Sequence, residues 1–452
     1  MRLEEYLETV SAQIRYAKIR GSVTTELKNH ILDQAEHYES YGVSPEEALE
    51  RAVRDMGDPV ETGAALDRIH RPSMSWGIVI AIAVLSMFSI GVFYMANIQA
   101  HDLFPWQRQA FFVLVGFALM LLIYRLDYSI LGISGWIPCV TYLLFLIIGY
   151  PFYGVSVHGM TRWIQLGFLS FSVSEAMLLY VPLFGAALYS FRGDRYHVLL
   201  KAIPLILVPT YFVSRLPDLS TAVILFTCLF CLFIFAIWKD WYQISKKLMI
   251  GILSGIVLLS PLILIGYYYF FGADYQSARI RAFFTQSGDA GYIRSLAENI
   301  RESSALFGSS EESLQLLVNG PTSDYLTDFI IVSMCSIYGT LITIAVIAGL
   351  LLIIMKVFHI SVTQKNQLGM ILGTGCGLVF FVKTAVGILV NLQLLPHASI
   401  SMPFLSHGGS NVIVSYLLLG LVLSIYRYKN ILPCQRESGR KRLKLKFTWE
   451  TR

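Results

Sequence analysis

The feature of this sequence that most limits its fold is a series of about ten apolar runs, each about 20 residues long, after residue 75. A helix of that length crosses the hydrocarbon core of a bilayer, where only helices and closed barrels satisfy all their backbone hydrogen bonds. The chain is 55% hydrophobic and only 14% charged, which excludes an ordinary soluble protein. We therefore predict an all-α, polytopic membrane protein with about ten transmembrane helices, near 76–97, 108–125, 130–150, 174–191, 197–214, 220–238, 247–271, 326–356, 367–390 and 410–427.

The first 70 residues are polar and precede the apolar runs. Ser44 before Pro45 and two glutamates predicts a helix start, residues 57–59 (Gly-Asp-Pro) predict its end, and another helix should run from about Val60 to His70. Apolar residues recur at helical spacing in three sets, namely Leu3, Tyr6, Leu7 and Val10; Leu27, Ile31 and Ala35; and Ala48, Ala52 and Val53. We expect a small soluble domain of about four short helices at 1–70.

Residues 45–48 (Pro-Glu-Glu-Ala) and 56–59 (Met-Gly-Asp-Pro) strengthen this interpretation of the first 70 residues. With these motifs the region is similar to the small helical prefix domain that precedes some bacterial permeases and sigma-factor regulators. That resemblance implies a role in regulation or partner docking and supplies no catalytic group.

The distribution of basic residues predicts the orientation of the chain. No apolar signal-peptide segment opens the sequence, so the N-terminus should stay in the cytoplasm, and an even number of spans returns the C-terminus there. Lysine and arginine then concentrate on the inner side, including the basic tail 431–452, as the positive-inside rule requires. This pattern suits a membrane surface and not a nucleic acid. The large loop 272–325 and the connections 153–172 and 397–411 fall on the outer side.

Four charged residues lie at or near membrane depth, where an ionised side chain is costly. Glu175, Asp218 and Asp328 lie near predicted helix starts on the outer side, and Lys383 interrupts the ninth span. Each of them could simply pair with another charge or reach the headgroups. Together, on one side of the membrane, they indicate a polar cleft.

The last outer connection reads Ile-Ser-Met-Pro-Phe-Leu-Ser-His-Gly-Gly-Ser-Asn from residue 400 to residue 411. The glycine pair allows the backbone to approach a ligand or another helix closely, and Ser410 could cap the final helix. Free N–H groups at such a helix start would suit an anionic headgroup. Ser406, Gly408, Gly409 and Ser410 are therefore candidates for substrate contact, and a tight turn is the alternative.

Residues 403–410 resemble the Pro-Phe-x-Ser-Tyr-Gly-Gly-Ser signature of the SEDS family (shape, elongation, division and sporulation; the RodA, FtsW and SpoVE group), with His407 in place of tyrosine. The resemblance covers about residues 76–430. Four further segments are similar to family motifs in the same order, namely 158–164 (His-Gly-Met-Thr-Arg-Trp-Ile), 171–175 (Phe-Ser-Val-Ser-Glu), 216–222 (Leu-Pro-Asp-Leu-Ser-Thr-Ala) and 327–330 (Thr-Asp-Phe-Ile).

This resemblance implies a peptidoglycan glycosyltransferase in a bacterial cytoplasmic membrane, serving elongation, division or sporulation. Its substrate would be lipid II, the undecaprenyl-pyrophosphate-linked disaccharide-pentapeptide, polymerised on the outer face. Its partner would be a class B penicillin-binding protein, which supplies transpeptidation. In this interpretation Trp163, Glu175, Asp218, Asp328 and Lys383 line the cleft or hold its structure.

The family's catalytic carboxylate lies in the large outer loop, and the resemblance places it at Asp289, after Arg279-Ile280 and Phe283-Phe284. Joining two sugars with loss of a lipid pyrophosphate needs a base for the acceptor hydroxyl and cations for the leaving group. We expect Asp289 to be the base and Arg162, Arg279 and Arg281 to bind the anionic donor.

One departure from the family pattern keeps two other functions open. A glycine-rich run normally follows this point, but the chain has Ile293, Leu296, Ile300 and Phe307 at near-helical spacing, which suits a segment on the membrane surface. That loss favours a degenerate scaffold or regulator of a penicillin-binding protein. Ten spans with buried charges would also fit a flippase or transporter for a lipid-linked precursor.

No cofactor follows from the sequence, which contains no dedicated metal-ligand motif. A divalent cation such as Mg²⁺ or Mn²⁺ could nevertheless screen the diphosphate, because no cluster of lysine and arginine in the outer loops suffices alone.

Overall fold

A computed structural model describes most of the 452 residues. They divide into two compact units, Met1–Ser73 with Arg427–Arg452, and Met74–Tyr426. The described residues are 2–99, 106–133, 135–157, 160–166, 169–216, 218–271, 277, 280–281, 283–284, 288–319, 326–396 and 398–429.

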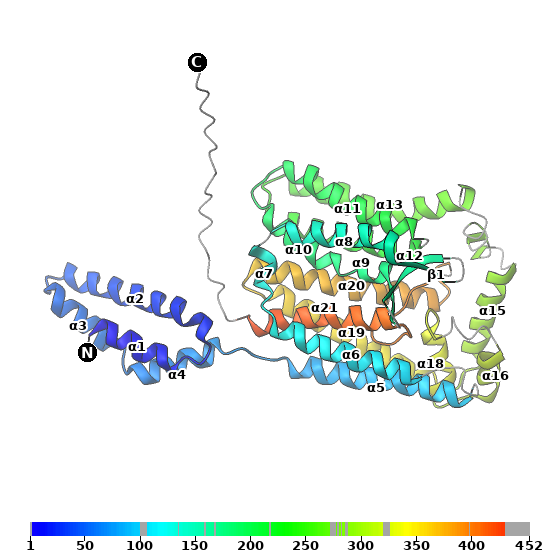
Figure 1. The fold of residues 1–452 in the computed structure, drawn as a ribbon, viewed down its shortest axis with the longest axis horizontal. Coiled ribbons are helices and arrows are strands. Elements are labelled where there is room, and N and C mark those ends of the chain that lie inside the picture. Colours follow the sequence, from blue (N-terminus) through cyan, green and yellow to red (C-terminus); the bar gives the residue numbers. More distant parts are fainter. Residues whose placement is uncertain are drawn as a thin grey trace, which may run out of the picture. The chain divides into compact units, whose positions relative to one another are not determined.

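The described part of the N-terminal unit is helical. Its helices are α1 (Leu3–Gln13), α2 (Ala17–Ser40), α3 (Pro45–Asp55) and α4 (Pro59–His70) (Figure 1). At 24 residues, α2 is longer than the short helix expected from the sequence. The apolar positions at helical spacing form the core of the unit, with Tyr6, Val10, Ile31, Ala35, Ala52 and Val53 buried.

The turn chemistry before α3 and α4 follows the sequence in part. Asp58 caps α4, since its carboxylate accepts a hydrogen bond of 2.9 Å from the backbone N–H of Glu61. Gly57, which ends α3, has φ +77°, a conformation that favours glycine. Pro45 opens α3 as predicted, but Ser44 makes no side-chain capping hydrogen bond there.

Nine helices in the described residues of the membrane unit are long and apolar enough to cross a membrane, which confirms the predicted polytopic helical fold. One of these spans, Val173–Ser190, is built from the two short helices α9 and α10. The helices are α5 (Trp76–Gln99), α6 (Trp106–Arg125), α9 (Val173–Met177) with α10 (Tyr180–Ser190), α11 (His197–Arg215), α12 (Leu219–Trp238), α13 (Lys246–Phe271), α19 (Thr340–Val362), α20 (Gln367–Asn391) and α21 (Gly409–Arg427) (Figure 1).

Two of the predicted spans are broken at glycines. The run 130–150 becomes α7 (Ser129–Ile133) and α8 (Ile137–Tyr153), because Gly135 has φ +60° between them. The run 326–356 becomes α18 (Ile330–Tyr338) and α19, with Gly339 at φ +90°. The spanning helix in this region is therefore 340–362, displaced toward the C-terminus from the predicted 326–356.

Two helices of the large loop, α15 (Gly288–Ser303) and α16 (Glu311–Asn319), lie along one end of the helical bundle in Figure 1. They pack against each other and against α18. The apolar side of α15 is therefore covered by protein, with Leu296, Ala297 and Ile300 buried.

A small antiparallel sheet follows α8 and was not predicted. Its strands are β1 (Gly154–Val157), β2 (Met160–Leu166) and β3 (Leu169–Ser172), in the order β1-β2-β3. In the register of the sheet, Trp163 on β2 pairs with Val155 on β1 and with Ser172 on β3. Strands of four to seven residues are hard to detect beside 20-residue apolar runs.

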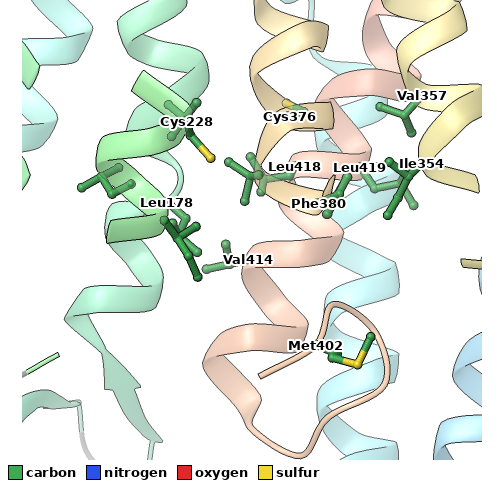
Figure 2. Close-up of a cluster of buried hydrophobic side chains, with 14 of the residues drawn as sticks. Leu178, Cys228, Ile354, Val357, Cys376, Phe380, Met402, Val414, Leu418 and Leu419 are labelled. Atoms are coloured by element: carbon green, nitrogen blue, oxygen red, sulfur yellow. The ribbon is translucent and has the colours of Figure 1, made fainter. Parts of the chain in front are cut away.

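Helix α20 is the centre of the membrane unit and contacts α10, α12, α18 and α19. Figure 2 shows Cys376 and Phe380 of α20 in one cluster with buried side chains of α12, α19 and α21. Glycines allow the close approach, since a Cβ at Gly373 would lie 2.4 Å from Ser361 Oγ on α19. Small residues at helix crossings are a common feature of packing within membranes.

Candidate functional site

A buried ion pair occupies the end of the bundle at which α20 ends and α21 begins. Lys383 Nζ on α20 lies 2.7 Å and 2.9 Å from the two carboxylate oxygens of Glu175 on α9. Asn411 Oδ1 on α21 accepts a third bond from the ammonium at 2.9 Å. The lysine side chain is 4% exposed and the glutamate side chain 14%. Because an ammonium carries three N–H donors, this set of acceptors satisfies it at a depth where water does not.

The polar connection between α20 and α21 is joined to this pair, which we call the Glu175–Lys383 cluster together with Ser401 and Asn411. Ser401 Oγ donates to Glu175 Oε1 at 2.9 Å. Asn411 Nδ2 donates to the carbonyl of Met402 at 2.9 Å. The cluster therefore fixes both the ion pair and the path of the backbone before α21.

Two serines predicted to bind substrate instead make contacts inside the protein. Ser406 is fully buried, donates to the carbonyl of Thr327 at 2.6 Å and accepts from the N–H of Met402 at 2.8 Å. Ser410, 4% exposed, accepts from the N–H of Ser172 at 2.8 Å. Substrate binding by these hydroxyl groups stays a prediction, and these contacts give both of them a part in the structure.

The glycine pair has a structural reason of its own. Gly408 has φ +137°, and a Cβ at Gly409 would lie 2.4 Å from the ring of Phe112 on α6. Both glycines are half-buried, so their backbone is the accessible part of the signature at the start of α21. Close packing and substrate approach are compatible at this position.

His407, which stands beside the glycine pair, is half-buried against the ring of Phe93 at 5.4 Å between centroids. Its backbone N–H donates to the carbonyl of Leu326 at 2.9 Å. Burial, together with the positive charge of Arg108, lowers the pKa of the imidazole. Both effects favour the neutral imidazole.

The two aspartates expected near the cleft are buried beside helix starts. Asp218 is the N-cap of α12 and accepts from the N–H of Thr221 at 3.1 Å. At Asp328 the backbone carbonyl accepts from Asn391 Nδ2 at 2.8 Å, and Asn391 Oδ1 accepts from the N–H of Ile331 at 3.1 Å. These contacts tie the end of α20 to the start of α18 and stabilise the same end of the bundle.

The predicted catalytic loop is described in part. Asp289 lies in the first turn of α15, and Arg162 lies in β2, but the structure describes the backbone alone at these two positions. Arg279 lies outside the described residues. Arg281 is exposed, with its guanidinium carbon 5.7 Å from the centroid of the Tyr269 ring. Trp163, predicted to line the cleft, is half-buried in β2.

Sequence reasoning missed several polar residues of this site. Ser401 and Asn411 complete the cluster, and Asn391 joins α20 to α18. Arg294 of α15 donates to the carbonyl of Phe283 at 2.6 Å and lies 4.9 Å from the centroid of that ring. The sequence did carry a signal for Asn391 and Asn411, since each lies near the end or the start of an apolar helix. A buried amide in a membrane needs hydrogen-bond partners, so such an asparagine indicates a polar contact.

An apolar groove opens between α11, α12 and α13 on the surface of the bundle, with a volume of about 770 Å³. Most of its lining is hydrocarbon, including Phe226, Ile256 and Ile263, with Thr210 and Ser214 among the few polar groups. Among the spanning helices described, α13 is the least covered by protein. The groove therefore has the lining that an acyl or prenyl chain needs.

Metal ligands do not gather in the described part of the chain, where no group of three or more His, Cys, Asp or Glu side chains could hold an ion.

The fold and the site together define a polytopic helical membrane protein with a buried ion pair beneath a polar loop at one membrane face. Comparison with known proteins places it more closely. The family model FTSW_RODA_SPOVE, described as "Cell cycle protein", matches residues 71–431, and the chain belongs to this family.

Relatives and solved structures agree with this family. Peptidoglycan glycosyltransferase MrdB of Escherichia coli (strain K12) is 27% identical over 383 residues, which cover 81% of this chain and 96% of that protein. The probable peptidoglycan glycosyltransferase FtsW of Enterococcus hirae is 25% identical over 331 residues, covering 70% and 82%. A chain from a peptidoglycan synthase complex superposes with a TM-score of 0.64 at 20% identity, covering 80% of this chain and 99% of that one. The rod shape determining protein RodA of Thermus thermophilus gives a TM-score of 0.54 at 17% identity, covering 79% and 98%.

Proposed function

We propose that this protein is a peptidoglycan glycosyltransferase that polymerises lipid II at the outer face of a bacterial cytoplasmic membrane. The observation that carries the proposal is a match along nearly the whole length of a named peptidoglycan glycosyltransferase, MrdB, in a chain whose described residues contain nine candidate membrane spans. The apolar groove between α11, α12 and α13 supports a substrate with a long hydrocarbon chain.

The proposed reaction forms a glycosidic bond and breaks the bond between a sugar and a lipid pyrophosphate. Asp289 takes the proton from the acceptor hydroxyl, whose oxygen then attacks the anomeric carbon of the donor sugar. The leaving lipid pyrophosphate keeps the electron pair of the broken bond, and Arg162, Arg279 and Arg281 stabilise its charge. The position of Asp289 in the first turn of α15 favours the ionised carboxylate, which is the form that accepts a proton, because free N–H groups at a helix start favour anions.

The mounting of α15 also supports a defined role for the loop. The helix packs on α18, whose beginning is tied to the Glu175–Lys383 cluster through Ser406 and Thr327. A general base must be held close to the proton it removes, and a misplacement of about 1 Å can cost about 100-fold in rate. These contacts hold the helix that carries Asp289 in a fixed position.

The first test is polymerisation of labelled lipid II by the purified protein, with Asp289→Asn as the test variant. Glu298→Gln is the matched control, because Glu298 lies on the same helix and its side chain is 43% exposed. We expect glycan polymer from the wild type and from Glu298→Gln, and a loss of at least about 100-fold in rate for Asp289→Asn. Equal polymer from all three proteins would remove Asp289 from the role of base.

A divalent cation, Mg²⁺ or Mn²⁺, belongs to this proposal as a screen for the diphosphate. The same assay with and without a chelator tests it, and an unchanged rate would reject the cation. A class B penicillin-binding protein is the proposed partner, supported by the similarity to a chain of a peptidoglycan synthase complex. Each variant should therefore be assayed with and without such a partner.

The second candidate is a non-catalytic scaffold for that partner. It is favoured by the structure of α15, an ordinary amphipathic helix packed on protein, in the part of the loop where the family resemblance leads us to expect glycines. Folded wild-type protein that makes no polymer with or without the partner, but still binds it, would replace the enzyme by the scaffold.

A further inference from the structure

The segment between α15 and α16 crosses the break between α18 and α19 and is hydrogen-bonded to it. The N–H groups of Thr340 and Leu341 donate to the carbonyls of Ala305 and Leu306 at 3.0 Å and 3.1 Å. In the other direction, the N–H of Gly308 donates to the carbonyl of Tyr338 at 2.9 Å. Residues 305–308 are therefore fixed by their backbone and do not depend on their side chains for position.

The break is shaped to receive this segment. Gly339 has φ +90° and ψ 163°, and a Cβ there would lie 2.7 Å from the carbonyl oxygen of Leu306 and 2.8 Å from the Cα of Phe307. Only glycine fits both the conformation and the space. The free N–H groups at the start of α19, which would otherwise lack partners near a membrane, are satisfied by the segment.

The depth of the break in the membrane follows from its neighbours. Helix α19 has 23 residues and is about 34 Å long, so its first turn lies at one edge of a hydrocarbon core of about 30 Å. Inside this edge, the Tyr338 ring packs 4.9 Å from the ring of Phe88 on α5, within the span Trp76–Ile98. The break therefore lies at the edge of the hydrocarbon core, and the bound segment lies at the same level.

At this level the segment presents two large apolar side chains outward. Leu306 is 67% exposed and Phe307 is 69% exposed. They continue an exposed apolar surface on the first turns of α19, where Leu341 is 42% exposed and Ile344 is 55% exposed. Little of the α19 span is covered by protein. Because an exposed apolar surface on a helix that spans a bilayer faces lipid, this surface of α19 faces lipid.

We propose that residues 305–308 are a membrane anchor, in which Leu306 and Phe307 insert into the interfacial layer of the bilayer beside α19. The occupant of this apolar surface is lipid. Because α15 ends at Ser303, two residues before the anchor, the inserted side chains hold that end of the helix at the membrane surface. The anchor does not depend on a glycosyltransferase activity.

The test places an environment-sensitive fluorophore on the anchor in the full chain, reconstituted in lipid nanodiscs. Phe307→Cys is the test variant and Ser309→Cys, two residues further on and exposed, is the matched control. Cys434 is replaced by serine and the half-buried Cys231 by alanine, and labelling of this parent protein sets the background, since Cys139, Cys228, Cys335 and Cys376 are buried. Quenching is compared between a lipid nitroxide placed near the headgroup and aqueous iodide.

We expect lipid nitroxide to quench the label at position 307 at least about twofold more strongly than at 309, and iodide to show the reverse order. Equal quenching by iodide at both positions would overturn the anchor. Shielding at 307 from both quenchers that appears only when a penicillin-binding protein is added would reassign the surface to a protein partner. A second variant, Phe307→Asp with the label at Leu306→Cys, should raise iodide quenching at 306, and no change there would also overturn it.

Discussion

The Glu175–Lys383 pair gives the sharpest prediction for the stability of the membrane unit. Replacing Lys383 by methionine leaves the carboxylate of Glu175 with the hydroxyl of Ser401 as its remaining partner in the cluster. Removing one member of a buried ion pair typically costs about 3–5 kcal/mol. Because the Glu175 side chain keeps 14% exposure and can reach some water, we expect about 2–4 kcal/mol for Lys383→Met.

Glu175→Gln should be destabilising for the complementary reason. It leaves an ammonium that is 4% exposed with neutral acceptors alone. The double variant Glu175→Gln/Lys383→Met removes both charges. We therefore expect its loss of unfolding free energy to be smaller than the sum of the two single losses by about 1–3 kcal/mol. This non-additivity is the signature of a direct interaction.

The protein carries a reporter for this measurement. Once Cys231 and Cys434 are replaced, the remaining Cys139, Cys228, Cys335 and Cys376 are all buried, so a thiol-reactive fluorogenic dye should react with them as the membrane unit unfolds on heating. Lys356→Met is the control, because this lysine is exposed on α19. A Tm for Lys383→Met equal to that of Lys356→Met, or strictly additive losses in the double variant, would refute the buried pair as a stabilising contact.

Three further predictions concern single residues. The pKa of His407 is lowered in the folded protein, so as pH falls the imidazole is protonated in the unfolded chain first. Stability should therefore fall as pH drops below about 6.5. His407→Asn should flatten that part of a Tm-against-pH curve, and an unchanged curve would contradict the burial of a neutral imidazole. Asp67 has a pKa lowered first by the backbone N–H of Arg15 and then by Arg71, so its contribution to the N-terminal unit is present above about pH 4 and is lost as pH falls through the lowered pKa; amide exchange in α4 of the full chain, corrected for intrinsic rates, should be faster in Asp67→Asn than in wild type near pH 7 and similar in both near pH 3. Gly339→Ala should lower stability by at least about 1–3 kcal/mol, because it forces a side chain into a conformation reserved for glycine and against Leu306. The control is Gly349→Ala, which lies within α19 with open space around it and should be neutral or stabilising. Equal Tm values for the two variants would count against the proposed fit.

The spans were predictable because each leaves a local signal, an apolar run of about 20 residues. The breaks were less so, since Gly135 and Gly339 stand among many glycines that lie inside helices without breaking them. What distinguishes Gly339 is the segment that packs on it from residues 305–308, and that contact is not encoded in the neighbouring sequence. The small sheet was missed because its strands are short and follow an apolar helix without a clear boundary.

The polar site shows a similar division. That Glu175 and Lys383 are unusual follows from their charge at membrane depth, but their pairing joins residues 208 positions apart, and spacing alone does not predict it. Ser401 and Asn411 were within view as polar residues of the last connection, yet their role depends on where the ion pair lies. The assignment of Asp289 rests on the family motif, and the structure contributes its place in the first turn of α15.

The contacts around α18 connect the ion pair, the segment 305–308 and α15 to one another. From the ion pair, hydrogen bonds run through Asn411 and Met402 to Ser406, and from there to the backbone at Thr327, just before α18 begins. The far end of α18 meets Gly339, where the backbone of 305–308 is bound. Since α15 packs on α18 along its side and is joined to that segment at its end, the helix that carries Asp289 is positioned from both ends of α18. A substitution at Lys383 should therefore displace a loop that it does not touch, and in the proposed enzyme it should lower the rate of polymerisation even at temperatures where the protein remains folded.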